Sequence, residues 1–148
     1  MQQRNNNNNR RPNNNQRPKI KKVNPKNADP MGTPTSMQRH AMHIFKDIAF
    51  GRWDFGVESD IFKIPAFVDN AMIAVYNELG AAMVHVQAIQ TAYANCQDPV
   101  VVNTLRADIK KQNAYQLIYN TLIQIKTYGD PSFILVLVNR LPEFKYDL

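Results

Sequence analysis

The stretch that decides the fold is VDNAMIAVYNELGAAMVHVQAIQTAYANC, residues 68–96. Apolar or small side chains recur along it at alternating steps of four and three residues. This spacing places them on one face of an α-helix and is the heptad pattern of helices that pair with other helices. The stretch therefore predicts a long helix with one continuous apolar seam, formed by Val68, Met72, Val75, Leu79, Ala82, Val86, Ile89, Tyr93 and Cys96.

Two Asp-Pro pairs mark the starts of the helices that follow. Asp98–Pro99 and Asp130–Pro131 each place a capping side chain just before a proline, which is tolerated in the first turn of a helix. They predict helices over about residues 99–128 and 131–140. Because the predicted helix over about 65–97 ends just before Asp98, it must fold back on the next one as an antiparallel hairpin about 45 Å long.

The remaining segments complete an all-α prediction. SMQRHAMHIFKDIAFG (36–51) predicts a helix over about 37–50 with Ser36 as its N-cap, and GRWDFGVESD (51–60) predicts a loop. The run FILVLV (133–138) is apolar nearly all round, which predicts a buried last helix, with a β-strand as the alternative. The expected fold is a small helical bundle built on a long antiparallel hairpin, with a disordered basic arm at the N-terminus.

The arm, residues 1–36, is set apart by composition and charge. It contains ten asparagines, five prolines and few large apolar side chains, which predicts disorder. It holds eight Lys or Arg against one Asp, a formal charge of +7, whereas residues 37–148 hold ten against eleven acidic residues, a charge of −1. All of the excess positive charge therefore lies in the arm, on Arg4, Arg10, Arg11, Arg17, Lys19, Lys21, Lys22 and Lys26.

A basic arm on a near-neutral body is typical of proteins that bind polyanions. Contacts from a disordered Lys/Arg segment go to phosphates, so nucleic acid would be bound without sequence preference. The asparagines keep the cations apart on a flexible chain. The alternative is that the Asn tract reflects gene composition and the cations only add solubility.

A secondary contact for single-stranded nucleic acid is predicted on the helix over 99–128, at Lys111, Tyr115, Tyr119 and Lys126. The alternative is an ordinary amphipathic rim.

Catalytic and metal chemistry find little support in the sequence. His40, His43 and Asp47 share one helical face, but no other strong ligand accompanies the two histidines and the aspartate. Asp54, Glu58 and Asp60 share one loop, but no phosphate-binding loop or activated nucleophile accompanies them. We expect no catalytic residue, no metal and no cofactor. A metal-dependent nuclease or hydrolase is retained only as a third hypothesis.

The apolar runs and the single cysteine indicate the compartment in which the protein is expected. Cys96 rules out an internal disulfide and favours a reducing compartment. The longest apolar run is far too short to cross a bilayer, and the N-terminus does not resemble a secretory signal. The expected location is intracellular, or a virion for a viral protein. The C-terminal LPEFKYDL (141–148) is either a peptide that docks onto a neighbouring subunit or partner, an edge strand or a frayed end.

The leading hypothesis is a non-enzymatic structural or assembly protein. Its arm would bind DNA or RNA, and its helical body would form homo-oligomers. This plan is similar, as an analogy of composition only, to small virion components such as capsid-internal or scaffold subunits. The alternative is a protein-binding adaptor in which the arm is only a tether. Interface residues under either hypothesis are Val68, Met72, Val75, Leu79, Val86, Ile89, Trp53 and Phe55.

Overall fold

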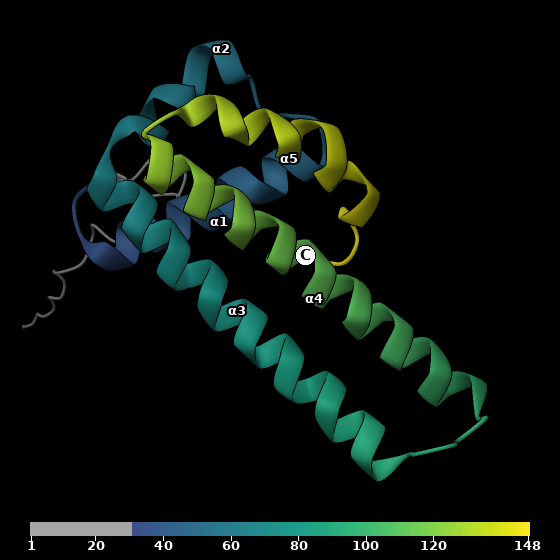
Figure 1. Cartoon of the computed structure of the whole chain (residues 1–148). Helices are drawn as coiled ribbons and strands as arrows, with labels where there is room; N and C mark the ends of the chain where they lie inside the picture. Colours follow the sequence, from purple (N-terminus) through teal and green to yellow (C-terminus); the bar gives the residue numbers. More distant parts are fainter. Residues whose placement is uncertain (1–30) are drawn as a thin grey trace, which may run out of the picture.

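The computed structural model describes residues 31–148, and the eight basic residues predicted to bind nucleic acid lie outside this range. Every regular element of the described part is helical, and the two longest helices pair antiparallel, so the predicted fold class is confirmed for this part (Figure 1). None of its helices combines the length and the apolar character that a membrane span requires. The elements are α1 (Pro34–Ala49), α2 (Phe55–Glu58), the 3₁₀ helix η3 (Ser59–Lys63), α3 (Pro65–Ala92), α4 (Pro99–Tyr128), the 3₁₀ helix η4 (Pro131–Ile134), α5 (Leu135–Arg140) and the 3₁₀ helix η5 (Leu141–Phe144).

The α3–α4 hairpin is the spine of the molecule, and its two helices lie side by side along their length (Figure 1). Later residues of α3 contact earlier residues of α4, as an antiparallel pair of helices requires. Three side-chain contacts span the pair: the Asp69–Lys126 ion pair, the Tyr76 and Tyr119 rings with centroids 5.7 Å apart, and the His85 Nδ1–Asp108 Oδ2 pair at 2.9 Å.

The helix starts follow the predicted Asp-Pro chemistry. Asp98 accepts a hydrogen bond from the Val100 backbone N–H at 2.9 Å, and Asp130 accepts one from Ser132 at the same distance. The N-cap of α1 is Thr33 rather than the predicted Ser36, because the Thr33 hydroxyl accepts from the Ser36 N–H and a proline follows it.

The helix α3 ends earlier than the seam pattern suggested. Its last residue is Ala92, and the predicted continuation to 97 is a link in which Asn95 adopts the left-handed conformation (φ 63°). The apolar spacing continues into this link because Tyr93 and Cys96 still line a groove at the tip of the hairpin, together with Val101. A heptad pattern marks where apolar side chains are needed and does not mark where the helix stops.

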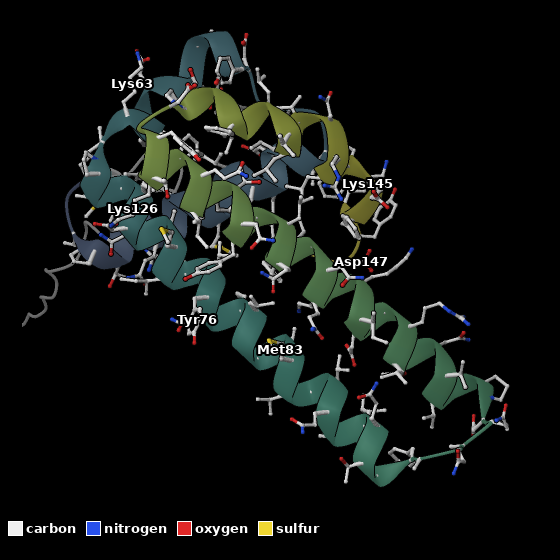
Figure 2. All side chains as sticks on the ribbon, viewed as in Figure 1. Lys63, Tyr76, Met83, Lys126, Lys145 and Asp147 are labelled. Atoms are coloured by element: carbon white, nitrogen blue, oxygen red, sulfur yellow. The ribbon has the colours of Figure 1, made fainter. Side chains whose placement is uncertain are left out.

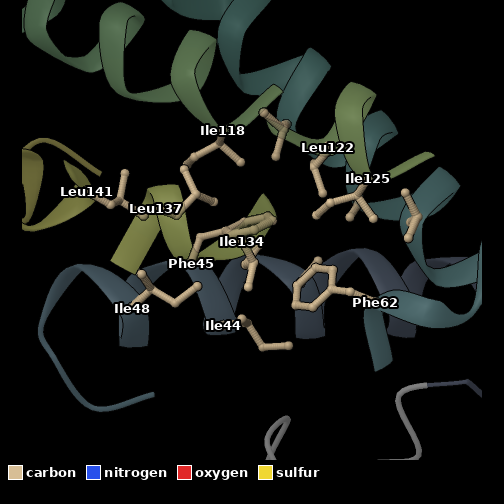
Figure 3. Packing of buried hydrophobic residues seen from close by; sticks show 14 of the residues in the cluster. Ile44, Phe45, Ile48, Phe62, Ile118, Leu122, Ile125, Ile134, Leu137 and Leu141 are labelled. Carbon is tan, nitrogen blue, oxygen red and sulfur yellow. The ribbon is translucent and has the colours of Figure 1, made fainter. Parts of the chain in front are cut away.

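The hydrophobic core lies at one end of the hairpin, in a region we call the head. Here α1, η3 and the η4–α5–η5 segment pack against the adjoining halves of α3 and α4 (Figure 1, Figure 3). Beyond it the hairpin continues as a region we call the distal half, residues 80–113. In the distal half only Ala82 and Val86 are buried, both of them on α3. The fully buried side chains of the head include Phe45, Phe62, Phe67, Ile118, Leu122, Ile125, Ile134, Leu137 and Leu141.

Two predictions for short segments were wrong. The last helix is not buried all round: Ile134, Leu137 and Leu141 face the core, and Leu135 and Val138 reach the surface. Its segment is short and follows the edge of the head, so only one side can be covered. Residues 51–60 are not a simple loop either, since they contain α2 and the start of η3.

The C-terminal peptide packs on the chain itself. Phe144 and Leu148 lie against the core cluster, and the Tyr146 ring contacts Phe50 edge-on with centroids 5.9 Å apart. The peptide is therefore neither an edge strand nor a frayed end, and its first residues form η5. Docking onto a neighbouring subunit or partner stays a prediction.

Candidate interaction surface

The polar groups considered for metal binding have other partners. Among residues 31–148 no group of three or more His, Cys, Asp or Glu side chains could hold a metal ion. The His40 ring packs edge-on against Phe67 with centroids 5.9 Å apart, and Asp47 accepts a hydrogen bond from Arg52 at 3.1 Å. His40 therefore serves packing, and Asp47 forms an ion pair with Arg52.

The acidic residues of the 51–60 segment shape local structure. The Asp54 carboxylate accepts the Gly56 N–H at 2.9 Å and starts α2, while Asp60 forms an exposed ion pair with Lys63 at 3.1 Å. Trp53 is buried, and its ring packs edge-on against Phe55 with centroids 6.1 Å apart, so Trp53 anchors the segment.

The predicted interface residues on α3 pack inside the chain. Val68, Val75, Leu79 and Val86 are buried, and Met72 and Ile89 are partly covered. The seam that dominates the sequence therefore joins α3 to its own chain. Any contact of α3 with a second molecule must use another side of the helix.

The stripe predicted to contact single strands is divided by the fold. Tyr115 is only 2% exposed, and burial, with the nearby Glu78 carboxylate as a second cause, raises its pKa to about 12. Its ring offers no surface on which a base could stack. Lys126 is paired with Asp69, and Tyr119 lies beside Tyr76. The structure does not bring the four residues together as one exposed track.

A different surface emerges on the flank of the hairpin, and we call it the Tyr76 face. It comprises Ile73, Tyr76, Gly80 and Met83 on α3 with Tyr119 and Ile123 on α4. The α3 members follow helical steps of three and four residues and so form one stripe. Ile73, Tyr76 and Met83 are 49%, 61% and 48% exposed, which is high for large apolar side chains. Figure 2 labels Tyr76 and Met83 along α3.

The Tyr76 face contains a groove and carries no charge between its ends. The groove, of about 400 Å³, is lined by Met72, Ile73, Tyr76, Asn77 and Tyr119, with Asp69 at its edge. The Asp69–Lys126 pair lies at one end of the face. His85, which pairs with Asp108, follows Met83 by two residues and therefore lies on the other flank of α3. The six residues of the face are all uncharged.

The sequence contains a signal for this face that the heptad seam obscures. The helix α3 has two acidic residues and no lysine or arginine over its whole length, so few charged side chains are present to cover the sides that α4 leaves open. A second stripe at 73, 76, 80 and 83 runs beside the seam. The sequence-based prediction did not include it, because the seam is longer and its spacing is unbroken.

Comparisons with protein-family models, with curated proteins and with solved structures gave no match for this chain. Its function is therefore inferred from its own charge distribution and surface chemistry.

Proposed function

We propose that this chain is a non-enzymatic structural or assembly protein. Its basic arm binds nucleic acid without sequence preference, and its helical body associates with further copies. The observation that carries the proposal is the separation of charge: +7 in residues 1–36 against −1 in residues 37–148. Solubility alone does not require all the excess charge at one end of the chain.

The physics of phosphate binding gives this charge a measurable consequence. Eight cations that neutralise phosphates release condensed counterions, so the affinity falls steeply with salt. One arm binds weakly at physiological ionic strength. Several arms carried on one assembly bind together far more tightly, because each further contact is intramolecular. Self-association of the body would thus multiply the affinity of the arm.

The test is nucleic-acid binding measured by fluorescence anisotropy on labelled duplex DNA and single-stranded RNA. Replacing the eight arm Lys and Arg by Gln should lower affinity by at least 100-fold at low salt. The matched control replaces the ten arm asparagines by Ser, keeps every cation and should bind like the wild type. Equal binding by the charge-neutralised chain would contradict the proposal.

A truncation gives an independent check if it begins in the right place. A chain starting at Met31 removes all eight cations and keeps Thr33, whose side chain caps α1. A chain starting at residue 37 would delete the first turn of α1 and confuse loss of binding with loss of folding. We expect the Met31 chain to keep its helical content and to lose nucleic-acid binding.

A protein-binding adaptor is the second candidate, and the exposed Tyr76 face is the observation that favours it. In that case a different protein would occupy the face, and the arm would act only as a tether. Neutralising the arm would then leave partner binding unchanged, whereas Tyr76→Ala would weaken it.

A further inference from the structure

We propose that the Tyr76 face binds a second copy of this chain, with the two copies related by a two-fold axis that passes close to Gly80. The inference rests on the self-association proposed above and names the surface that performs it. Three independent features of the face support it: a glycine without an internal role, a methionine that faces the other copy's groove, and an uncharged area large enough for a weak pair.

The first feature is Gly80, which lies in the interior of α3. Glycine is among the poorest helix formers, so an interior glycine calls for a reason. The chain itself supplies none, because a Cβ built at Gly80 would meet no atom within 4 Å. What a missing Cβ does provide is room for the backbone of another helix to approach closely. Gly80 lies in the middle of the exposed stripe, where such an approach would occur.

The second feature is the spacing of Met83 and the groove about Gly80. Met83 follows Gly80 by three residues, and Asn77, at the near end of the groove, precedes it by three. An antiparallel two-fold arrangement centred on Gly80 places Met83 of each copy opposite the Asn77 end of the other copy's groove. Methionine is flexible and polarizable and fills irregular apolar gaps well. The surface is therefore complementary to itself, as a two-fold interface must be.

The third feature is the size and charge of the face. From Asp69 to Met83, α3 rises about 21 Å, and two helices of about 10 Å diameter give a face of about 420 Å² per copy. Two such faces bury about 840 Å², which is in the range of weak, transient pairs. Because the six residues of the face are uncharged and Asp69 at its end is paired with Lys126, pairing two copies buries no isolated charge. The expected dimer is therefore weak and concentration-dependent.

The first arm of the test measures the mass of the full-length chain by sedimentation equilibrium across concentration. Wild type should pass from monomer to dimer, and Gly80→Leu should raise the dissociation constant by at least 30-fold. A Cβ at position 80 meets no atom within 4 Å, and leucine favours a helix more than glycine does, so the thermal midpoint of the monomer should not fall. Ala81→Leu is the matched control: it adds the same side chain at the next, exposed position of α3, off the face, and should dimerise like wild type.

The second arm locates the contact by cross-linking. In a Cys96→Ser background, Gly80→Cys should give a disulfide-linked dimer on mild oxidation, since a two-fold axis at residue 80 brings the two Cα atoms within the disulfide range of about 4.4–6.8 Å. Ala81→Cys should cross-link at least ten times more slowly.

The outcomes separate this inference from the proposed function. A wild-type dimer that persists in Gly80→Leu, with no preference for cysteine at position 80 over position 81, would overturn the surface and leave self-association standing. A wild-type chain that stays monomeric at every concentration would overturn both the surface and self-association. Binding of the arm to nucleic acid is measured separately and is unaffected by either result.

Discussion

The head and the distal half of the molecule are built from the same two helices and differ in what covers them. In the head, α3 and α4 are enclosed by α1, η3 and the C-terminal segment, and large side chains such as Phe67 and Leu122 are fully buried. Beyond Gly80 the two helices have mainly each other (Figure 1). Met83 and Val84 lie at the surface there. A heptad seam is thus sufficient to pair two helices, whereas burial of their remaining apolar surface requires further elements or a second molecule.

The largest expected effect comes from the same substitution made in each region of α4. Leu122→Ala in the head should lower the free energy of unfolding by about 3–4 kcal/mol, because it leaves a cavity in a closed core. Leu105→Ala in the distal half should cost about 1 kcal/mol, since that side chain is already partly exposed. Urea unfolding of both variants measures the difference. Equal costs would mean that the two regions are not distinguished by burial.

A pH titration sharpens the comparison through Tyr115, at the edge of the head. Its pKa is about 12 in the folded chain against about 10 unfolded, so the folded state keeps a proton that the unfolded state releases. Its contribution to stability is complete below pH 10 and is lost as the pH rises toward 12. We expect wild type to lose on the order of 2 kcal/mol over this window through Tyr115.

The control for that titration is the phenylalanine variant. Tyr115→Phe should remove this part of the alkaline loss, whereas Tyr93→Phe, at an exposed position near the tip, should leave it in place. Urea midpoints measured between about pH 9 and pH 12 give the comparison. An identical pH dependence in wild type and Tyr115→Phe would show that the buried hydroxyl does not govern it.

A smaller effect is expected at the boundary between the two regions. Gly80→Ala should raise the free energy of unfolding of the dilute monomer by about 1 kcal/mol, because alanine favours the helix and its Cβ has free space. Thermal unfolding at low protein concentration measures this. A loss of stability would mean that the chain itself occupies the space beside Gly80.

The smallest effect concerns the ion pair at the head end of the Tyr76 face. Both side chains of the Asp69–Lys126 pair are about half exposed, so Asp69→Asn should change the free energy of unfolding by no more than about 0.5 kcal/mol. The matched variant, His85→Gln, removes the pair with Asp108 in the distal half, off the Tyr76 face, and should have an equally small effect near neutral pH. A cost of about 2 kcal/mol or more would show that the pair acts in structure rather than at the rim of a surface.

The sequence predicted the features that depend on strong local chemistry. The Asp98–Pro99 and Asp130–Pro131 starts, the Gly129 end of α4 and the antiparallel hairpin all appear as expected. Features that depend on how the helices pack against one another in three dimensions were not predicted. The exposure of Leu135, the early end of α3 and the burial of Tyr115 follow from the head occupying only one end of the hairpin. Heptad spacing carries no information about how far along a helix pair the neighbouring elements extend.

The measurement that tests the central claim most directly is the salt dependence of duplex DNA binding by the full-length chain. If the arm neutralises phosphates with its eight cations, the logarithm of the binding constant should fall against the logarithm of salt concentration with a slope of about −6 to −7. The slope of the chain with its arm charges replaced by Gln should be close to zero. A shallow slope in wild type, or one that survives neutralisation of the arm, would contradict the assignment of nucleic-acid binding to residues 1–36.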